Sequence, residues 1–176
     1  MKNSVPFPSA AAAKKGLCAR WCWLWVPAVL SACSSYSPTG LPPGASIAQA
    51  EHDLGRRTAA YALPDGGQRL EFARGPAGKD TYMLDFDAQG HLLKWEQVLT
   101  EQNFAEIRKG LSEAEVLSRI GHPAVVNGVG FSKWRQRVWS YRYTHTECLW
   151  FQVGFDLQGQ VVDSGYGIDP ACDIRE

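Results

Sequence analysis

The sequence predicts an α+β protein made of two tandem units, each with one or two short helices packed on a three-stranded antiparallel sheet. Three observations lead to this fold class. A helix pattern recurs 66 residues further along the chain, a hairpin pattern recurs 69 residues further along, and the segments between them alternate apolar and polar residues. The composition, with 45% hydrophobic and 11% aromatic residues, is that of a chain that folds.

Residues 1–32 have the pattern of a secretory signal peptide. Four Lys or Arg residues and no Asp or Glu lie in this segment, and residues 21–30 form an apolar run. As a helix this run is about 15 Å long, which is too short to cross a bilayer. Since four of the 18 basic residues lie here, the rest of the chain has 14 basic and 18 acidic residues, a net charge of −4. That charge argues against nucleic-acid binding, which needs a basic surface.

Cys33 is predicted to be the acylated first residue of the mature protein. Leu30-Ser31-Ala32-Cys33 directly follows the apolar run and resembles the lipobox of bacterial lipoproteins. In that group a residue other than Asp after the cysteine usually directs the protein to the outer membrane, and here it is Ser34. The resemblance implies a lipid anchor with palmitate. The alternative is an ordinary secretory signal cleaved nearby, which would leave Cys33 unmodified.

Residues 33–44 are predicted to be a flexible tether between the membrane and the folded part, because they are rich in Ser, Pro and Gly. The cysteines that remain after the signal and the lipid site are Cys148 and Cys172. An even remainder in an exported chain predicts one disulfide between them.

The first tandem unit is predicted over residues 45–99 and the second over residues 100–176. Each unit begins with a helix whose N-cap serine has a Gln or Glu three residues later, Ser46 in one and Ser112 in the other. The segments ending in Phe86 and Phe155 are each followed by an Asp-x-x-Gly turn and another apolar segment, which predicts a hairpin. One further strand precedes each hairpin, at residues 69–72 and 138–143.

The second unit resembles a known family. Gly110-Leu-Ser-x-x-Glu-Val followed by Ile120-Gly-x-Pro123, with a sheet after it, is similar to the SmpA/OmlA (BamE-like) outer-membrane lipoproteins over residues 103–166. The match is weaker over residues 44–98, where Arg57 stands in place of the expected Pro. A tandem pair of such units also resembles the fold of the β-lactamase-inhibitor protein. These motifs describe a helix cap and a turn, so they indicate fold more than function.

The sequence offers no catalytic, cofactor or metal site. The four histidines are far apart and have no metal-ligand spacing. Residues 145–148 include His, Glu and Cys, but at the start of a strand their side chains would point to alternate faces and could not bind one metal ion. The protein is therefore predicted not to be an enzyme. The candidate interaction site is the loop 125–137, which gathers aromatic and cationic residues for a protein or membrane contact: Phe131, Lys133, Trp134, Arg135 and Arg137. The alternative is that Trp134 folds back on its own sheet.

The leading hypothesis is a non-enzymatic outer-membrane lipoprotein that faces the periplasm and supports envelope assembly by binding another protein, as the family resemblance implies. The competing hypothesis is an inhibitor or sensor module that captures a soluble periplasmic or secreted enzyme. Lipidation and Ser34 favour the first. The tandem arrangement favours the inhibitor or sensor module, because the BamE-like lipoproteins that support assembly need only a single unit.

Overall fold

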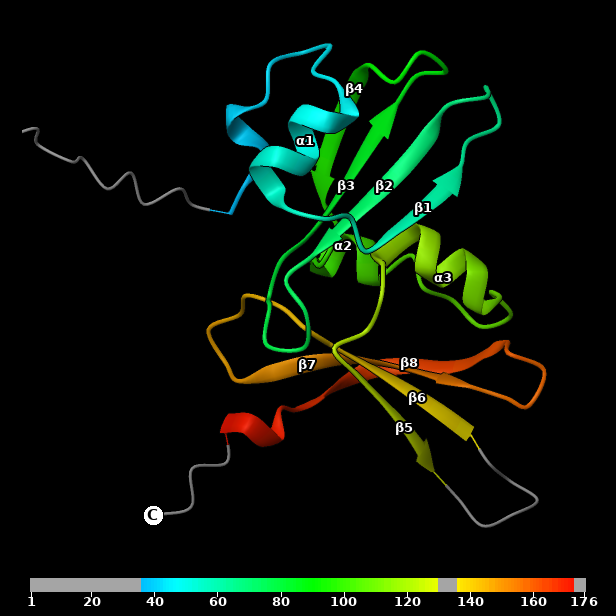
Figure 1. Ribbon diagram of the computed structural model, residues 1–176. Helices are drawn as coiled ribbons and strands as arrows, with labels where there is room; N and C mark the ends of the chain where they lie inside the picture. The colour runs from blue at the N-terminus through cyan, green and yellow to red at the C-terminus, as the bar shows by residue number, and fades with distance from the viewer. Residues whose placement is uncertain (1–35, 130–135, 173–176) are drawn as a thin grey trace, which may run out of the picture. The chain divides into compact units, whose positions relative to one another are not determined.

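The computed structural model describes residues 36–129 and 136–172 (Figure 1). No helix within these two ranges is long and apolar enough to cross a membrane. The described residues form two antiparallel sheets of four strands each, together with short helices.

The first sheet has the strand order β1-β2-β3-β4 and the second has the order β5-β6-β7-β8 (Figure 1). The first consists of β1 (Ala59–Ala62), β2 (Gln68–Ala73), β3 (Thr81–Phe86) and β4 (Leu92–Gln97). The second consists of β5 (Val125–Val129), β6 (Gln136–Arg142), β7 (Leu149–Phe155) and β8 (Val161–Ile168). The α+β class is confirmed.

The prediction of three strands in each sheet is wrong, because it missed β1 and β5. Strand β1 is Ala-Ala-Tyr-Ala, in which three alanines have low strand propensity and there is little apolar alternation. Strand β5 contains Asn127-Gly128, a pair typical of turns. Pairing with the neighbouring strand outweighs local propensity in both cases, and β5 forms five pairs with β6.

The main helices are α1 (Ile47–Leu54) and α3 (Glu113–Ile120), and the single turn α2 (Glu101–Phe104) lies between them in the sequence. The Ser46 hydroxyl accepts the Gln49 N–H, and the Ser112 hydroxyl accepts the Glu115 N–H. Only the second cap is reciprocal, since the Glu115 carboxylate also accepts the Ser112 N–H at 2.8 Å. Two 3-10 turns complete the elements, η1 (Pro38–Gly40) and η2 (Pro170–Cys172).

The two sheets repeat one strand register at an offset of 69 residues. In the first sheet Leu70 pairs with Leu84, and in the second Trp139 pairs with Val153. The pairing shifts at the same place in both sheets, beside Phe86 in one and Phe155 in the other. The offset read from the hairpin sequences is therefore also the offset of the strand pairs.

Each sheet has its own hydrophobic cluster. Helix α1 contributes Ala50 and Leu54 to a cluster on one face of the first sheet, which includes Leu70, Phe72, Leu84 and Phe86. Helices α2 and α3 contribute to a cluster on the second sheet, and its members are Leu99, Phe104, Ile107, Val116, Ile120, Trp139, Tyr141, Tyr143, Phe151, Val153, Phe155 and Val161. The contacts that join the two sheets therefore do not belong to either hydrophobic cluster.

The prediction of a flexible tether over residues 33–44 is wrong for residues 36–44. Pro38 is buried in η1, and Leu41 is 7% exposed within the cluster of the first sheet. Tyr36 packs against the same cluster. The composition suggested a linker, but Pro38 and Leu41 provide apolar contacts that order the segment. Residues 33–35 lie outside the described ranges.

Candidate functional site

The two sheets differ in what covers the face opposite their main helix. On the first sheet this face carries Arg69 and Asp85, which form an ion pair with Nε and Oδ1 2.6 Å apart. Arg69 Nη1 also donates to the carbonyl of Ser118 in α3 at 3.2 Å. Helix α3 thus contacts the first sheet as well as the second, and β3 is buried at all six positions.

Glu71 is the centre of this joint between the first sheet and the end of α3. It is fully buried, and its carboxylate accepts the backbone N–H of His122 and the hydroxyl of Tyr61, at 2.8 and 2.7 Å. His122 Nδ1 lies 2.8 Å from the second carboxylate oxygen. Burial and the Glu71 carboxylate raise the pKa of Tyr61 well above its ordinary value. The two contacts with His122 join the two halves, and the Tyr61 hydroxyl holds the carboxylate within the first sheet.

The equivalent face of the second sheet has different residues in the same register. Val138, Ser140, Gln152 and Gly154 stand at the positions of Arg69, Glu71, Met83 and Asp85 in the first sheet. Within the described ranges, no helix or strand covers this face; the middle of β8 is exposed and Val138 and Gln152 are half-buried, while Ser140 and Gly154 are buried among their neighbours in the sheet. We call these four residues, together with Asp163 and Gly165 of β8, the open face.

The open face is shallow and made of small and polar groups. It holds a depression of about 240 Å³ whose lining includes Gln136, Val138, Gln152 and Asp163. Gln152 donates to the hydroxyl of Ser140 at 3.1 Å, and the carboxylate of Asp163 lies over Gly154. A side chain added at Gly165 would meet nothing within 4 Å. The backbone of β8 can therefore be approached closely from this side.

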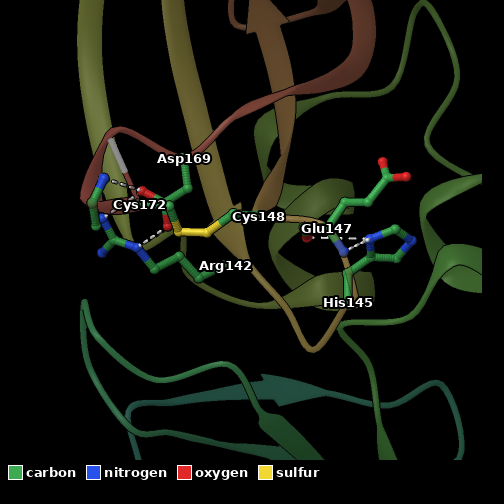
Figure 2. The surroundings of a disulfide bond; sticks show 7 residues. Arg142, His145, Glu147, Cys148, Asp169 and Cys172 are labelled. Atoms are coloured by element: carbon green, nitrogen blue, oxygen red, sulfur yellow. Dashed lines mark hydrogen bonds and ion pairs between the residues drawn. A yellow bond between two sulfur atoms is a disulfide. The ribbon is translucent and has the colours of Figure 1, made fainter. Parts of the chain in front are cut away.

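A disulfide closes one end of the second sheet (Figure 2). Cys148 and Cys172, the pair that the sequence predicts, are bonded, with their Cα atoms 6.1 Å apart. Beside them Arg142 binds Asp169 with Nε and Oδ2 2.5 Å apart, and it also donates to the carbonyl of Pro76 between β2 and β3. The Arg142 hydrogen bond lowers the pKa of Asp169 below its ordinary value.

His145 and Glu147 lie beside the disulfide in Figure 2 but do not form a metal site. The ring nitrogen Nδ1 of His145 accepts the backbone N–H of Glu147 at 3.0 Å, so the ring shapes the turn. Its other nitrogen, Nε2, lies 3.3 Å from the carboxylate of Glu101. Across the described part of the chain, no group of three or more His, Cys, Asp or Glu could hold a metal ion.

The predicted interaction loop is shorter than expected, because residues 125–129 form β5 and residues 136–137 belong to β6. Phe131, Lys133, Trp134 and Arg135 lie outside the described residues, as does Cys33. Arg137 is described, and it pairs with Glu113 at the start of α3. That pair gives Arg137 a structural role within the second unit.

Two further features were not evident from the sequence. Trp150 belongs to the outer face of the second sheet but is only 8% exposed, since its ring lies against Gly167 and beneath the guanidinium of Arg142. The Glu71 and His122 contact was missed because the residues are 51 positions apart and belong to different units. No local pattern marks either residue as one of a pair.

Neither a family model nor a curated protein matches this chain. Among solved structures, a proposed β-lactamase inhibitor protein from Streptococcus mutans is similar, with 12% identity and a TM-score of 0.33 over 76% of this chain and 88% of that one. A cysteine-rich secretory protein from Staphylococcus aureus shows 12% identity and a TM-score of 0.27 over 72% of this chain and 44% of that one. The resemblance to the SmpA/OmlA family stays a prediction.

Proposed function

We propose that this protein is a non-enzymatic lipoprotein of the outer membrane that faces the periplasm and supports envelope or outer-membrane protein assembly by binding another protein. The open face is the proposed binding surface. The observation that carries this proposal is the contrast between equivalent faces: the first sheet uses this face to bind α3, whereas no described helix or strand packs on the same face of the second sheet, where the middle of β8 is exposed.

The chemistry of the open face favours a protein partner. Gly165 lets another chain approach the strand backbone, and the half-buried amide of Gln152, held by the buried hydroxyl of Ser140, offers a donor and an acceptor in a fixed position. A surface of this kind is recognised by polar contacts and close backbone packing, which are features of non-obligate interfaces. Asp163 adds one exposed negative charge, which complements a basic group on the partner.

The buried polar groups are consistent with a binding role and not with catalysis. Glu71 and His122 form the only close carboxylate and imidazole pair with a fully buried member in the described ranges, and such a pair could serve as a general base. However, both oxygens of Glu71 are already held by Tyr61 and His122, including the backbone of His122. These bonds stabilise the joint between the halves.

The proposal is tested by blocking the open face and recovering the partner from gently solubilised membranes. Gly165→Gln places a neutral side chain on the open face, where the structure leaves room for it. The matched control is Gly128→Gln in β5, which also meets nothing within 4 Å and lies on the other face of the same sheet. Both variants are expected to keep the wild-type melting temperature, and only Gly165→Gln should lose the partner.

The identity of the recovered protein separates the two functional hypotheses. Subunits of the barrel-assembly machinery that depend on the open face would support a role in assembly. A soluble periplasmic or secreted enzyme would instead support the inhibitor or sensor module. Equal recovery by wild type and Gly165→Gln would contradict the open face as the binding surface.

A further inference from the structure

The packing of Tyr36 places a limit on how far the first sheet can lie from a lipid anchor at Cys33. Tyr36 packs against the cluster of the first sheet, so only Ser34 and Ser35 separate it from Cys33. An extended chain spans at most about 3.5 Å per residue, which gives roughly 10 Å between the two Cα atoms. If Cys33 carries the lipid, as the proposed function requires, the surface around Tyr36 must lie at the membrane.

That surface is aromatic. The ring centroids of Tyr36 and Tyr82 are 5.8 Å apart, and those of Tyr82 and Trp95 are 6.0 Å apart. The three side chains therefore form a continuous row from Tyr36, the first described residue, to β4. Trp95 lies at the end of this row. It is 38% exposed, whereas tryptophan is highly buried on average.

Exposed apolar groups continue from Trp95. Leu93 is 58% exposed, and a groove of about 290 Å³ connects Leu93 and Trp95 with Leu41 and Pro43. These residues come from β4 and from the segment that follows η1. The surface formed by Tyr36, Leu41, Pro43, Leu93 and Trp95 is called the anchor face below.

A cation borders the anchor face. The guanidinium of Arg74 lies 4.8 Å from the centre of the Tyr36 ring, and the nearby acidic group is Asp80, which faces Tyr36. Lys94, between Leu93 and Trp95 in the sequence, is turned to the other side of β4, where its ammonium lies 3.5 Å from the carboxylate of Asp85. Tyrosine, tryptophan and basic residues beside exposed apolar groups are typical of surfaces that meet lipid head groups.

We propose that the anchor face lies on the lipid surface, with Trp95 and Leu93 at the level of the head groups and Arg74 near lipid phosphates. The inference rests on the proposed acylation of Cys33 and adds a defined orientation of the folded part on the membrane. The first sheet then lies against the membrane, and its contact supplements the acyl chains.

The test uses the lipidated full chain on phospholipid vesicles with a fluorescent label on a single added cysteine. Acylation uses Cys33 and the disulfide uses Cys148 and Cys172, so Leu93→Cys supplies one reactive thiol. Leu157→Cys is the matched control, since Leu157 is 65% exposed in the turn between β7 and β8. Vesicle flotation reports membrane attachment, and quenching by lipids with nitroxide-labelled acyl chains reports membrane contact.

The expected result is flotation of both labelled proteins, with a blue-shifted and strongly quenched label at position 93 and an unquenched label at position 157. Flotation with no quenching at position 93, or with equal quenching at both positions, would overturn the anchor face and leave the lipid anchor intact. Absence of flotation would overturn the lipid anchor, and with it the distance limit on which the anchor face depends.

Discussion

The first and second sheets share a strand register but expose different surfaces. In the first, a charged face with Arg69, Glu71 and Asp85 is closed by the end of α3. In the second, the equivalent positions are Val138, Ser140 and Gly154, and no described helix or strand closes the face. A buried carboxylate such as Glu71 needs several partners, whereas Ser140, which is also buried, has a single hydrogen bond with Gln152. One copy of the repeated fold therefore joins the two halves through this face, and no described helix or strand uses the same face of the other copy.

The largest expected effect is at the charged face. Glu71→Ala removes the acceptor of three hydrogen bonds and should lower the free energy of unfolding by about 3 kcal/mol. The equivalent change in the second sheet, Ser140→Ala, removes one hydrogen bond with Gln152 and should cost about 1 kcal/mol. Urea unfolding of both variants measures the difference. Equal losses would mean that the joint at Glu71 contributes no more than the open face.

A second comparison uses glycines that end the equivalent helices. Gly55 after α1 and Gly121 after α3 have φ values of 82° and 77°, so alanine is strained at both positions. Only at Gly121 would the added Cβ meet other groups, lying 2.9 Å from Glu71 Oε1 and 3.0 Å from Thr81 Cγ2. Gly121→Ala should therefore be less stable than Gly55→Ala by about 1 to 3 kcal/mol.

Thermal and urea unfolding of the two glycine variants measure the cost of crowding at Gly121, because the backbone strain is common to both variants. If Gly55→Ala lost as much stability as Gly121→Ala, the close approach of Gly121 to the first sheet would make no measurable contribution. A restored stability in the double variant Gly121→Ala with Thr81→Ser would support the steric account, since the Thr81 methyl is one of the crowded groups.

Local patterns predicted much of each unit from the sequence. The serine caps at Ser46 and Ser112 and the Asp-x-x-Gly turns after Phe86 and Phe155 depend on neighbouring residues, and these elements lie where the sequence indicates. The strands β1 and β5 were missed because their order comes from pairing with β2 and β6. Propensity alone does not describe such edge strands.

The candidate sites were less predictable, because they depend on which faces meet. Nothing near Glu71 in the sequence marks it as buried, and its main partner His122 belongs to the other unit. The open face is defined by the lack of a helix or strand packed on it within the described ranges. A short stretch of sequence does not show which element packs on which face. The predicted loop was recognised from its composition, and four of its residues lie outside the described ranges.

The smallest expected effect concerns the ion pair at the disulfide end of the second sheet. Because the Arg142 hydrogen bond lowers the pKa of Asp169 in the folded protein, the charged form stabilises the fold above the unfolded pKa of about 3.9. This contribution decreases as the pH falls through that value toward the folded pKa, where the carboxylate is protonated. Asp169→Asn should therefore cost about 1.5 kcal/mol near neutral pH and progressively less below about pH 4.

The control for this experiment is Asp163→Asn on the open face. Asp163 is exposed and makes no ion pair with another described residue, so its replacement should change stability by less than about 0.5 kcal/mol at any pH. Urea unfolding near pH 7 and near pH 3 gives the pH dependence of both variants. A loss for Asp169→Asn that stayed constant over this range would show that the charge of the carboxylate makes no measurable contribution to stability, since the hydrogen bonds from Arg142 and Ala171 both favour the charged form.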